Sequence, residues 1–281
     1  MLANVLSPQA QEVPVLGTLH RPGGTLGYDV AGDGPLVVLA HGMGDLRGTY
    51  RRLAPALRAA GHRVAALDLR GHGDASTGWD DVSTTAVAGD LLALVEELGG
   101  PAVLVGSSYS GGAAVVAAAR RPDLVAGLVL SGAFVRDVPR TRGQRAAAWL
   151  VARTPLGRPL WSAYVPSLYG TRPDDLAEHR RALAANLREP GRWAAVAAMA
   201  RAGHAASEAV LGDVRAPALV VVGCQDPDFA DPAEEARRTA AALGGPADVL
   251  LVDGAGHYPH LERPDVVTPA VLALARRAAV A

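Results

Sequence analysis

Lysine is absent from this 281-residue chain, and all 27 basic residues are arginine. Its absence excludes any enzyme mechanism that forms a Schiff base through a lysine amine. Cysteine occurs once, as Cys224, so no disulfide can form within the chain. Because Cys224 ends an apolar run, we expect a buried thiol that packs as a small hydrophobic side chain and not a nucleophile.

The chain also has no large surplus of positive or negative charge. Its formal net charge at pH 7 is −1. This balance gives no electrostatic reason to expect nucleic acid or a membrane surface as a partner. No uninterrupted apolar run approaches the roughly 18 residues of a membrane span. Residues 1–14 lack the basic and apolar regions of a signal peptide. We therefore expect a cytoplasmic protein that binds neither nucleic acid nor a membrane.

Aromatic side chains make up only 4% of the sequence, and they are unevenly distributed. Three of the four tryptophans fall within residues 136–213, a segment with no convincing strand that six prolines divide into several helices. We expect this segment to be a helical insertion in one core domain formed by residues 1–135 and 214–281. The aromatic residues that stand out in it are Trp149, Trp161, Tyr164, Tyr169 and Trp193.

Short apolar runs alternate with amphipathic or alanine-rich stretches in the rest of the chain. A run such as 36–40, apolar at every position, is typical of a strand buried on both faces of a parallel sheet. Strands that alternate with helices predict an α/β fold with a mostly parallel central sheet flanked by helices. We expect strands at 13–20, 25–31, 36–40, 64–67, 102–105, 124–130, 218–222 and 247–252, and helices at 50–60, 84–98, 113–119, 232–243 and 265–279.

Three serines lie between the apolar run 102–105 and the helix-permissive run that follows Gly112. Small residues on both sides allow a strained turn between a strand and a helix. Such a turn holds one hydroxyl above the edge of the sheet, beside the positive end of the helix. We assign this place to Ser108, which follows the strand at the right distance. Ser110 is the alternative, although it would lie within the helix.

The turn Gly106-Ser107-Ser108-Tyr109-Ser110 resembles the Gly-x-Ser-x-Gly nucleophile elbow of the α/β-hydrolase superfamily, with Ser110 in place of the second glycine. Other motifs of this superfamily follow further expected strands, at whose carboxyl ends ligands bind in such sheets. They are His41-Gly42-Met43-Gly44, the Asp68–Ser76 loop, Gly223-Cys224-Gln225-Asp226 and Gly256-His257.

This resemblance implies a catalytic triad in the chain order serine, acid, histidine. Ser108 would be the nucleophile, His257 the general base, and Asp226 the acid that orients the imidazole. Asp228 stays open as an alternative acid, and so does Asp137, because some hydrolases place the acid after the preceding strand.

The same resemblance implies an oxyanion hole made by the backbone amides of Met43 and Tyr109. It also implies that the helical insertion, residues 136–213, forms a lid over the active site, and that the first two strands are antiparallel. An apolar pocket under such a lid would suit a hydrophobic substrate, and a homodimer through the lid is compatible with this organisation. The substrate-binding residues expected there are Trp149, Trp161, Tyr164 and Trp193.

We therefore expect a serine hydrolase that cleaves a carboxylic ester or a related acyl bond of a small, hydrophobic substrate through an acyl-enzyme. Carbon–carbon bond hydrolases, lactonases, thioesterases and haloperoxidase-like enzymes share this triad, and a small-molecule sensor is an alternative of another class. A serine at the elbow argues against haloalkane dehalogenase and epoxide hydrolase activity, for which relatives use aspartate. We expect no metal, since the histidines lack ligand spacing, and no cofactor, since Gly42-Met43-Gly44 lacks the further glycine of a dinucleotide loop.

Overall fold

The computed structural model describes residues 13–138 and 142–279, and within them eight strands form one sheet. The strand order is β1-β2-β4-β3-β5-β6-β7-β8, in which β2 pairs antiparallel with β1 and β4 while all other neighbours are parallel. The mostly parallel sheet predicted from the sequence is thereby confirmed. The strands are β1 Val15–Arg21, β2 Gly24–Ala31, β3 Leu36–Ala40, β4 Arg63–Leu67, β5 Ala102–Ser107, β6 Val125–Ser131, β7 Ala218–Gly223 and β8 Ala247–Val252.

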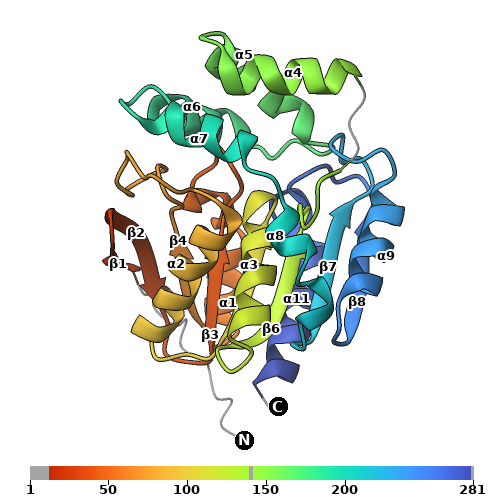
Figure 1. The fold of residues 1–281 in the computed structure, drawn as a ribbon. Helices are drawn as coiled ribbons and strands as arrows, with labels where there is room; N and C mark the ends of the chain where they lie inside the picture. Colours follow the sequence, from red (N-terminus) through yellow and green to blue (C-terminus); the bar gives the residue numbers. More distant parts are fainter. Residues whose placement is uncertain (1–12, 139–141, 280–281) are drawn as a thin grey trace, which may run out of the picture.

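Helices cover both faces of this sheet (Figure 1). Along β3, Val37 and Leu39 join one hydrophobic cluster with α1 and α11, whereas Val38 joins another with α2 and α3. The all-apolar strand pattern therefore reflects burial on both sides, because successive side chains point to opposite faces. The flanking helices are α1 Leu53–Ala59, α2 Thr84–Glu97, α3 Tyr109–Arg120, α9 Pro232–Ala242, α10 Pro259–Glu262 and α11 Pro264–Ala278.

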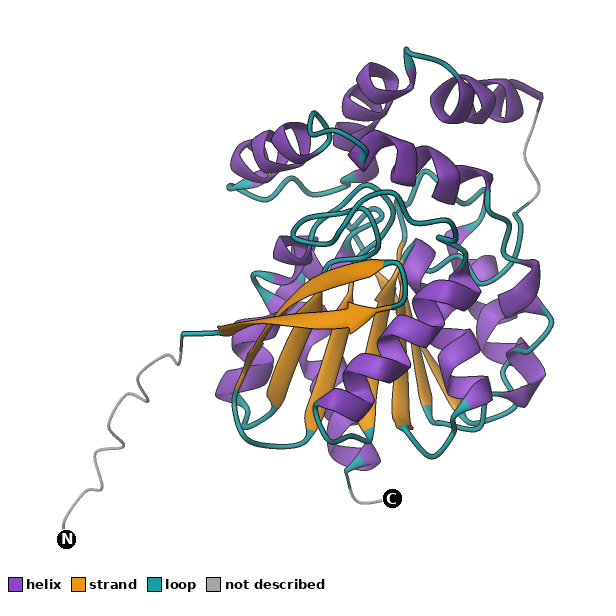
Figure 2. Ribbon diagram, turned by 60° about the vertical axis from the view of Figure 1, so that its left-hand side comes forward, coloured by secondary structure: helices purple, strands orange, loops and turns teal. Residues whose placement is uncertain are grey.

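A helical insert follows β6 in the chain and precedes β7. Its helices α4 to α7 lie above the carboxyl ends of the strands, whereas α8 and η3 pack against α3 (Figures 1 and 2). The described part of residues 136–213 contains no strand, in keeping with the sequence. Two polar contacts join α6 to the core: Arg51 donates to both carboxylate oxygens of Asp175 at 2.7 Å, and His179 lies 2.9 Å from Asp45. The elements of the insert are α4 Arg142–Arg153, α5 Gly157–Tyr164, η2 Val165–Leu168, α6 Leu176–Asn186, α7 Arg192–Arg201, α8 Ala205–Glu208 and η3 Leu211–Asp213.

Two local predictions from the sequence differ from the structure. The helix expected at 50–60 is divided into a 3₁₀ turn, η1 Arg47–Tyr50, and the shorter α1. Cys224 is exposed and not buried, because β7 ends at Gly223 and the chain turns away from the sheet at the next residue. Its thiol is not activated either, since partial desolvation and the neighbouring Asp253 carboxylate raise its pKa.

Membrane insertion by a helix finds no support in the described residues. None of their helices is both long and apolar enough to cross a bilayer.

Candidate active site

The elbow between β5 and α3 places Ser108 in a strained backbone conformation. Its φ of 53° makes it the only described residue other than glycine with a positive φ. A Cβ at Gly106 would lie 2.7 Å from the carbonyl oxygen of Ser110, so only glycine fits two positions before the turn. The turn is held by two backbone bonds, from the Ser108 amide to Ser131 at 3.0 Å and from the Phe134 amide to Ser108 at 3.1 Å. Strain maintained in this way is typical of a functional residue.

The other two serines of the elbow are fully buried, whereas Ser108 is partly exposed. The Ser110 hydroxyl donates to the carbonyl oxygen of Ala40 at 2.6 Å and accepts from the Ser107 amide at 2.9 Å. Ser110 thus joins the elbow to β3, which gives a physical reason for serine at a position where the family motif has glycine. Its hydroxyl is engaged in these bonds and is not presented to a substrate.

Replacing Ser110 with alanine should lower the free energy of unfolding by about 1–2 kcal/mol, since the buried Ser107 amide loses its side-chain acceptor and the Ala40 carbonyl oxygen keeps only the Tyr50 hydroxyl of its two hydroxyl donors. The hydrolytic rate should stay within about threefold of wild type, because Ser108 keeps its position. Urea unfolding measures the first effect and ester hydrolysis the second. Loss of activity in a variant of unchanged stability would instead identify Ser110 as the reacting serine.

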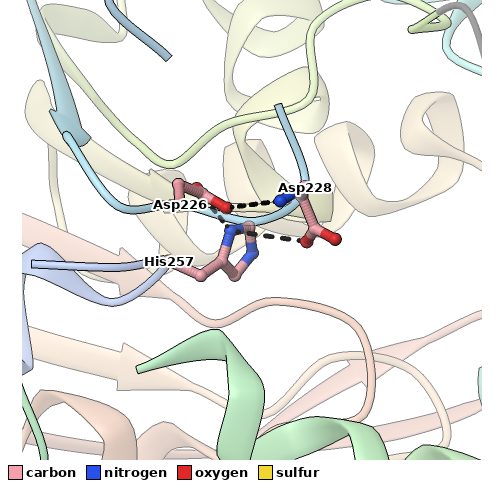
Figure 3. A group of neighbouring side chains, drawn as sticks. All are labelled: Asp226, Asp228 and His257. Atoms are coloured by element: carbon pink, nitrogen blue, oxygen red, sulfur yellow. Dashed lines mark hydrogen bonds and ion pairs between the residues drawn. The ribbon is translucent and has the colours of Figure 1, made fainter. Parts of the chain in front are cut away.

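The loops after β7 and β8 bring a carboxylate and an imidazole together (Figure 3). The Nδ1 of His257 lies 2.8 Å from Oδ2 of Asp226, and both side chains are about 2% exposed. The second oxygen of Asp226 accepts from the backbone amide of Asp228 at 3.0 Å. Asp226 is thereby fixed on both sides and holds the imidazole with Nε2 free to exchange a proton.

The pKa of His257 is raised from 6.5 to about 9. Burial, the largest single cause, lowers it, but the charge and hydrogen bond of Asp226 together with the carboxylates of Asp228 and Glu262 raise it by more. The folded state therefore favours the imidazolium that a general base becomes after it accepts a proton.

Neither alternative acid contacts the His257 imidazole as closely as Asp226 does. Asp228 Oδ2 is 3.6 Å from His257 Nδ1, and its other oxygen accepts a hydrogen bond from the hydroxyl of Tyr164 in α5. Asp137 accepts from the amide of His204, away from His257.

Asp226, Asp228 and His257 are close enough together to be compared with a metal site. The Nδ1 atom that faces the carboxylates already makes the Asp226 hydrogen bond, so the arrangement is that of an ion pair.

Glu262 is a site residue that sequence reasoning missed. Its buried carboxylate accepts hydrogen bonds from the amides on both sides of His257, those of Gly256 at 3.0 Å and Tyr258 at 3.1 Å. It also accepts from the amide of Thr171 in the helical insert at 2.8 Å. Glu262 therefore fixes the loop that carries the imidazole. Its place five residues after His257 is the only sequence signal, and a glutamate there is not diagnostic.

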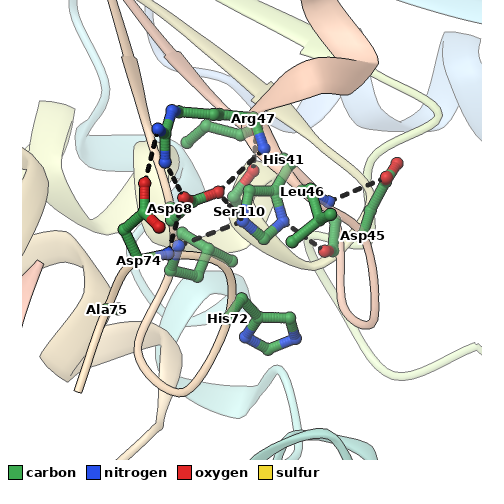
Figure 4. A network of polar contacts seen from close by, with 12 residues as sticks. His41, Asp45, Leu46, Arg47, Asp68, His72, Asp74, Ala75 and Ser110 are labelled. Atoms are coloured by element: carbon green, nitrogen blue, oxygen red, sulfur yellow. Dashed lines mark hydrogen bonds and ion pairs between the residues drawn. The ribbon is translucent and has the colours of Figure 1, made fainter. Parts of the chain in front are cut away.

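The loop after β3 rests on a buried polar network (Figure 4). His41 accepts from the Leu69 amide at 3.0 Å, and His72 accepts from the Gly44 amide at 3.0 Å. Burial is the largest cause that lowers the pKa of His72, to about 3, so this ring is a neutral acceptor. Asp68 accepts from the backbone and the guanidinium of Arg47, which anchors the end of the loop. These side chains hold the loop.

Two backbone amides in this region have no partner. Neither the Met43 nor the Tyr109 amide donates a hydrogen bond to a residue in 13–138 or 142–279. A Cβ at Gly42 would lie 3.3 Å from Ser108 Oγ, so the loop passes directly beside the hydroxyl. Backbone amides without partners beside a hydroxyl are the kind of donor that an oxyanion hole uses.

Phe134 connects the serine to the histidine. Its amide binds the carbonyl oxygen of Ser108, and its ring centroid lies 6.0 Å from that of His257. No hydrogen bond joins Ser108 Oγ to His257 Nε2 among the residues that the structure describes. Such bonds are often long without substrate and shorten in the reacting complex.

The four aromatic residues expected to bind substrate occupy different places. The Trp161 indole packs against Gly44 in the loop after β3, and the Tyr164 hydroxyl donates a hydrogen bond to Asp228. Trp193 packs against Gly157 within the insert, and Trp149 on α4 is 56% exposed. The structure therefore brings two of the four to the loops that carry the site.

The sheet order, the strained elbow and the two loops define an α/β hydrolase. The model of the alpha/beta hydrolase family matches residues 37–270, and the chain belongs to this family.

Named relatives include several kinds of hydrolase. A probable esterase of rice (Oryza sativa subsp. japonica) is 30% identical over 274 residues, which cover 86% of this chain and 93% of the rice protein. The mouse (Mus musculus) sn-1-specific diacylglycerol lipase ABHD11 is 34% identical over 160 residues, about half the length of each protein. An epoxide hydrolase of Caballeronia sordidicola is 37% identical over 115 residues, 36% of this chain and 35% of the relative. Among solved structures, a thermophilic esterase from Thermogutta terrifontis aligns with a TM-score of 0.77 and 29% identity, covering 96% of this chain and 99% of the esterase.

Proposed function

We propose that this hydrolase cleaves a carboxylic ester or a related acyl bond of a small, hydrophobic substrate, as a carboxylic ester hydrolase. The observation that carries the proposal is the partly exposed Ser108, held at a strained elbow beside two unpartnered amides. Ser108 Oγ attacks the acyl carbon while His257 Nε2 accepts its proton, and Asp226 stabilises the imidazolium. The amides of Met43 and Tyr109 bind the oxyanion.

The second half of the reaction uses the same groups. The imidazolium gives its proton to the departing alkoxide, and the acyl group stays on Ser108 as an ester. Water, deprotonated by His257, then attacks the acyl carbon and releases the acid. In this proposal residues 136–213 act as a lid over the core formed by 1–135 and 214–281, and the aromatic residues of the lid line the substrate pocket.

Epoxide opening is not proposed despite the relatives of that class. Those enzymes use an aspartate at the elbow, which attacks carbon and forms an ester that water then cleaves. A serine hydroxyl in that place would form a stable ether, so the intermediate could not be hydrolysed. The match to the Caballeronia sordidicola epoxide hydrolase also covers only 36% of the chain.

A fluorophosphonate probe tests the proposal directly. We expect one probe molecule per chain, attached to the peptide that contains Ser108, because only an activated serine displaces fluoride from phosphorus at a useful rate. Mass spectrometry of the digested protein locates the label, and the Ser110→Ala variant serves as the control that should still be labelled. A folded wild-type protein that remains unlabelled at saturating probe would contradict the proposal.

A further inference from the structure

A cleft of about 350 Å³ lies between α5 and α6, two helices of the helical insert. This volume lies within the range of small-molecule sites. Most of its lining is apolar, and two charged side chains share it. The lining includes Trp161 and Val165 on one side, and Leu183, Leu187, Arg180 and Arg181 on the other.

Trp161 connects this cleft to the catalytic loops. A Cβ at Gly44 would lie 2.7 Å from the indole Nε1, so the ring packs directly on the loop that carries the Met43 amide. The same ring lines the cleft. Its Nε1 is buried and has no hydrogen-bond partner among the described residues. A buried donor without an acceptor is costly, and the edge of the indole that carries it packs against Gly44.

The two arginines of the cleft are not engaged elsewhere. Neither the Arg180 nor the Arg181 guanidinium makes a hydrogen bond or an ion pair with any residue in the described ranges. Both side chains are exposed, so they keep their water while they line one end of an apolar cleft. A carboxylate is the group whose shape and charge best match a free guanidinium.

We infer that the cleft receives the part of the substrate remote from the scissile bond, and that it prefers an apolar chain with an anionic group at its far end. The chain would extend from Ser108 past the Trp161 ring, with its carboxylate beside Arg180 and Arg181. This inference rests on the proposed ester hydrolysis for its chemistry, but the cleft itself can be tested by binding alone.

Two esters of equal chain length test the inference by turnover: p-nitrophenyl octanoate and the mono-p-nitrophenyl ester of octanedioic acid. Exposed ion pairs are individually weak, so we expect the wild-type kcat/KM to favour the acid-ended ester by about tenfold. The double variant Arg180→Gln/Arg181→Gln should lose this preference and keep the rate for the neutral ester. Arg188→Gln removes the same charge from an exposed arginine that follows α6 and does not line the cleft, and it should keep the preference.

A preference that is absent in the wild type, or that survives in the double variant, would overturn the inference.

Filling the cleft with Ala184→Phe provides a second test, because Ala184 also lines it. This variant should abolish the gain in kcat/KM from short to long acyl chains for both kinds of ester. If chain length still raises the rate as in the wild type, the chain binds elsewhere.

Direct binding separates this inference from the proposed function. Calorimetry of the Ser108→Ala protein with octanoate and with octan-1-ol needs no turnover. We expect octanoate to bind more tightly, and the difference to disappear when both arginines are replaced. Equal affinity for the acid and the alcohol would overturn the inference even if the ester is hydrolysed. Absence of turnover with both esters would overturn the proposed function and leave the binding result to decide on the cleft.

Discussion

Replacing Ser108 with alanine should reduce kcat by roughly 10⁴- to 10⁶-fold, since loss of a serine nucleophile abolishes the acyl-enzyme route. A p-nitrophenyl ester series of increasing chain length measures the loss. In the proposed mechanism, residual hydrolysis would come from the unpartnered Met43 and Tyr109 amides, which would still stabilise an oxyanion formed by attack of water. KM should change little, because the hydroxyl contributes to the transition state and not to binding of the ester.

Ser110→Ala is the matched control, because it removes a hydroxyl from the same elbow. It should lower stability and keep activity, whereas Ser108→Ala should keep stability and lose activity. The Ser108 side chain makes no hydrogen bond within the described residues, so its removal leaves no buried group without a partner. Full activity in Ser108→Ala would show that another group attacks the ester.

Asp226→Asn should lower kcat by about 10⁴-fold near neutral pH, because an amide cannot stabilise the imidazolium and favours the wrong tautomer of His257. The amide nitrogen would face Nδ1, which donates to the carboxylate in the wild-type protein. Steady-state kinetics at a series of pH values measures the loss. A fall of less than tenfold would mean that Asp226 is not the acid of the triad.

Asp228→Asn is the matched variant for this substitution, since it removes a carboxylate 3.6 Å from the same nitrogen. His257 acts as a base only when neutral, so wild-type kcat/KM should rise with pH toward the pKa of His257, about 9. Asp228 raises that pKa, so Asp228→Asn should move the acid limb of the profile to lower pH while kcat on the plateau stays within about tenfold. An unchanged acid limb would exclude an electrostatic effect of Asp228 on the base.

The same ionisation affects stability in the opposite direction. The folded-state pKa of His257 lies above its unfolded value of 6.5, so the folded protein binds the proton more tightly. The stabilisation is present in full below pH 6.5 and is lost as the pH rises through about 9. The imidazole thus becomes active as a base over the range in which it stabilises the fold least.

Features that depend on neighbouring residues in the sequence were predictable. Strand β3, at Leu36–Ala40, and strand β8, at Ala247–Val252, have the bounds expected from their apolar runs. The elbow could be located because a strand, three small residues and a helix follow one another directly. The order of the motifs then indicated which loops meet at one edge of the sheet.

Features that depend on contacts between distant segments were not predictable. Glu262 supports His257 only because the chain returns through a short helix, and its third partner, Thr171, belongs to the insert. Likewise, His179 is an ordinary helical histidine until α6 brings it 2.9 Å from Asp45. Cys224 shows the reverse case. In the sequence it continues the apolar run of β7, but the strand ends at Gly223, so the Cys224 side chain is exposed.

The carboxylate of Glu262 has a consequence for protein engineering. It accepts hydrogen bonds from backbone amides in two segments about 90 residues apart in the chain, at Thr171 and on both sides of His257. A chimaera that takes its whole 136–213 segment from another family member would need an amide in the same place, or the histidine loop would lose one of its supports. A graft that replaces α4 and α5 alone, and ends before Thr171, leaves that support intact and is the safer route to a new specificity.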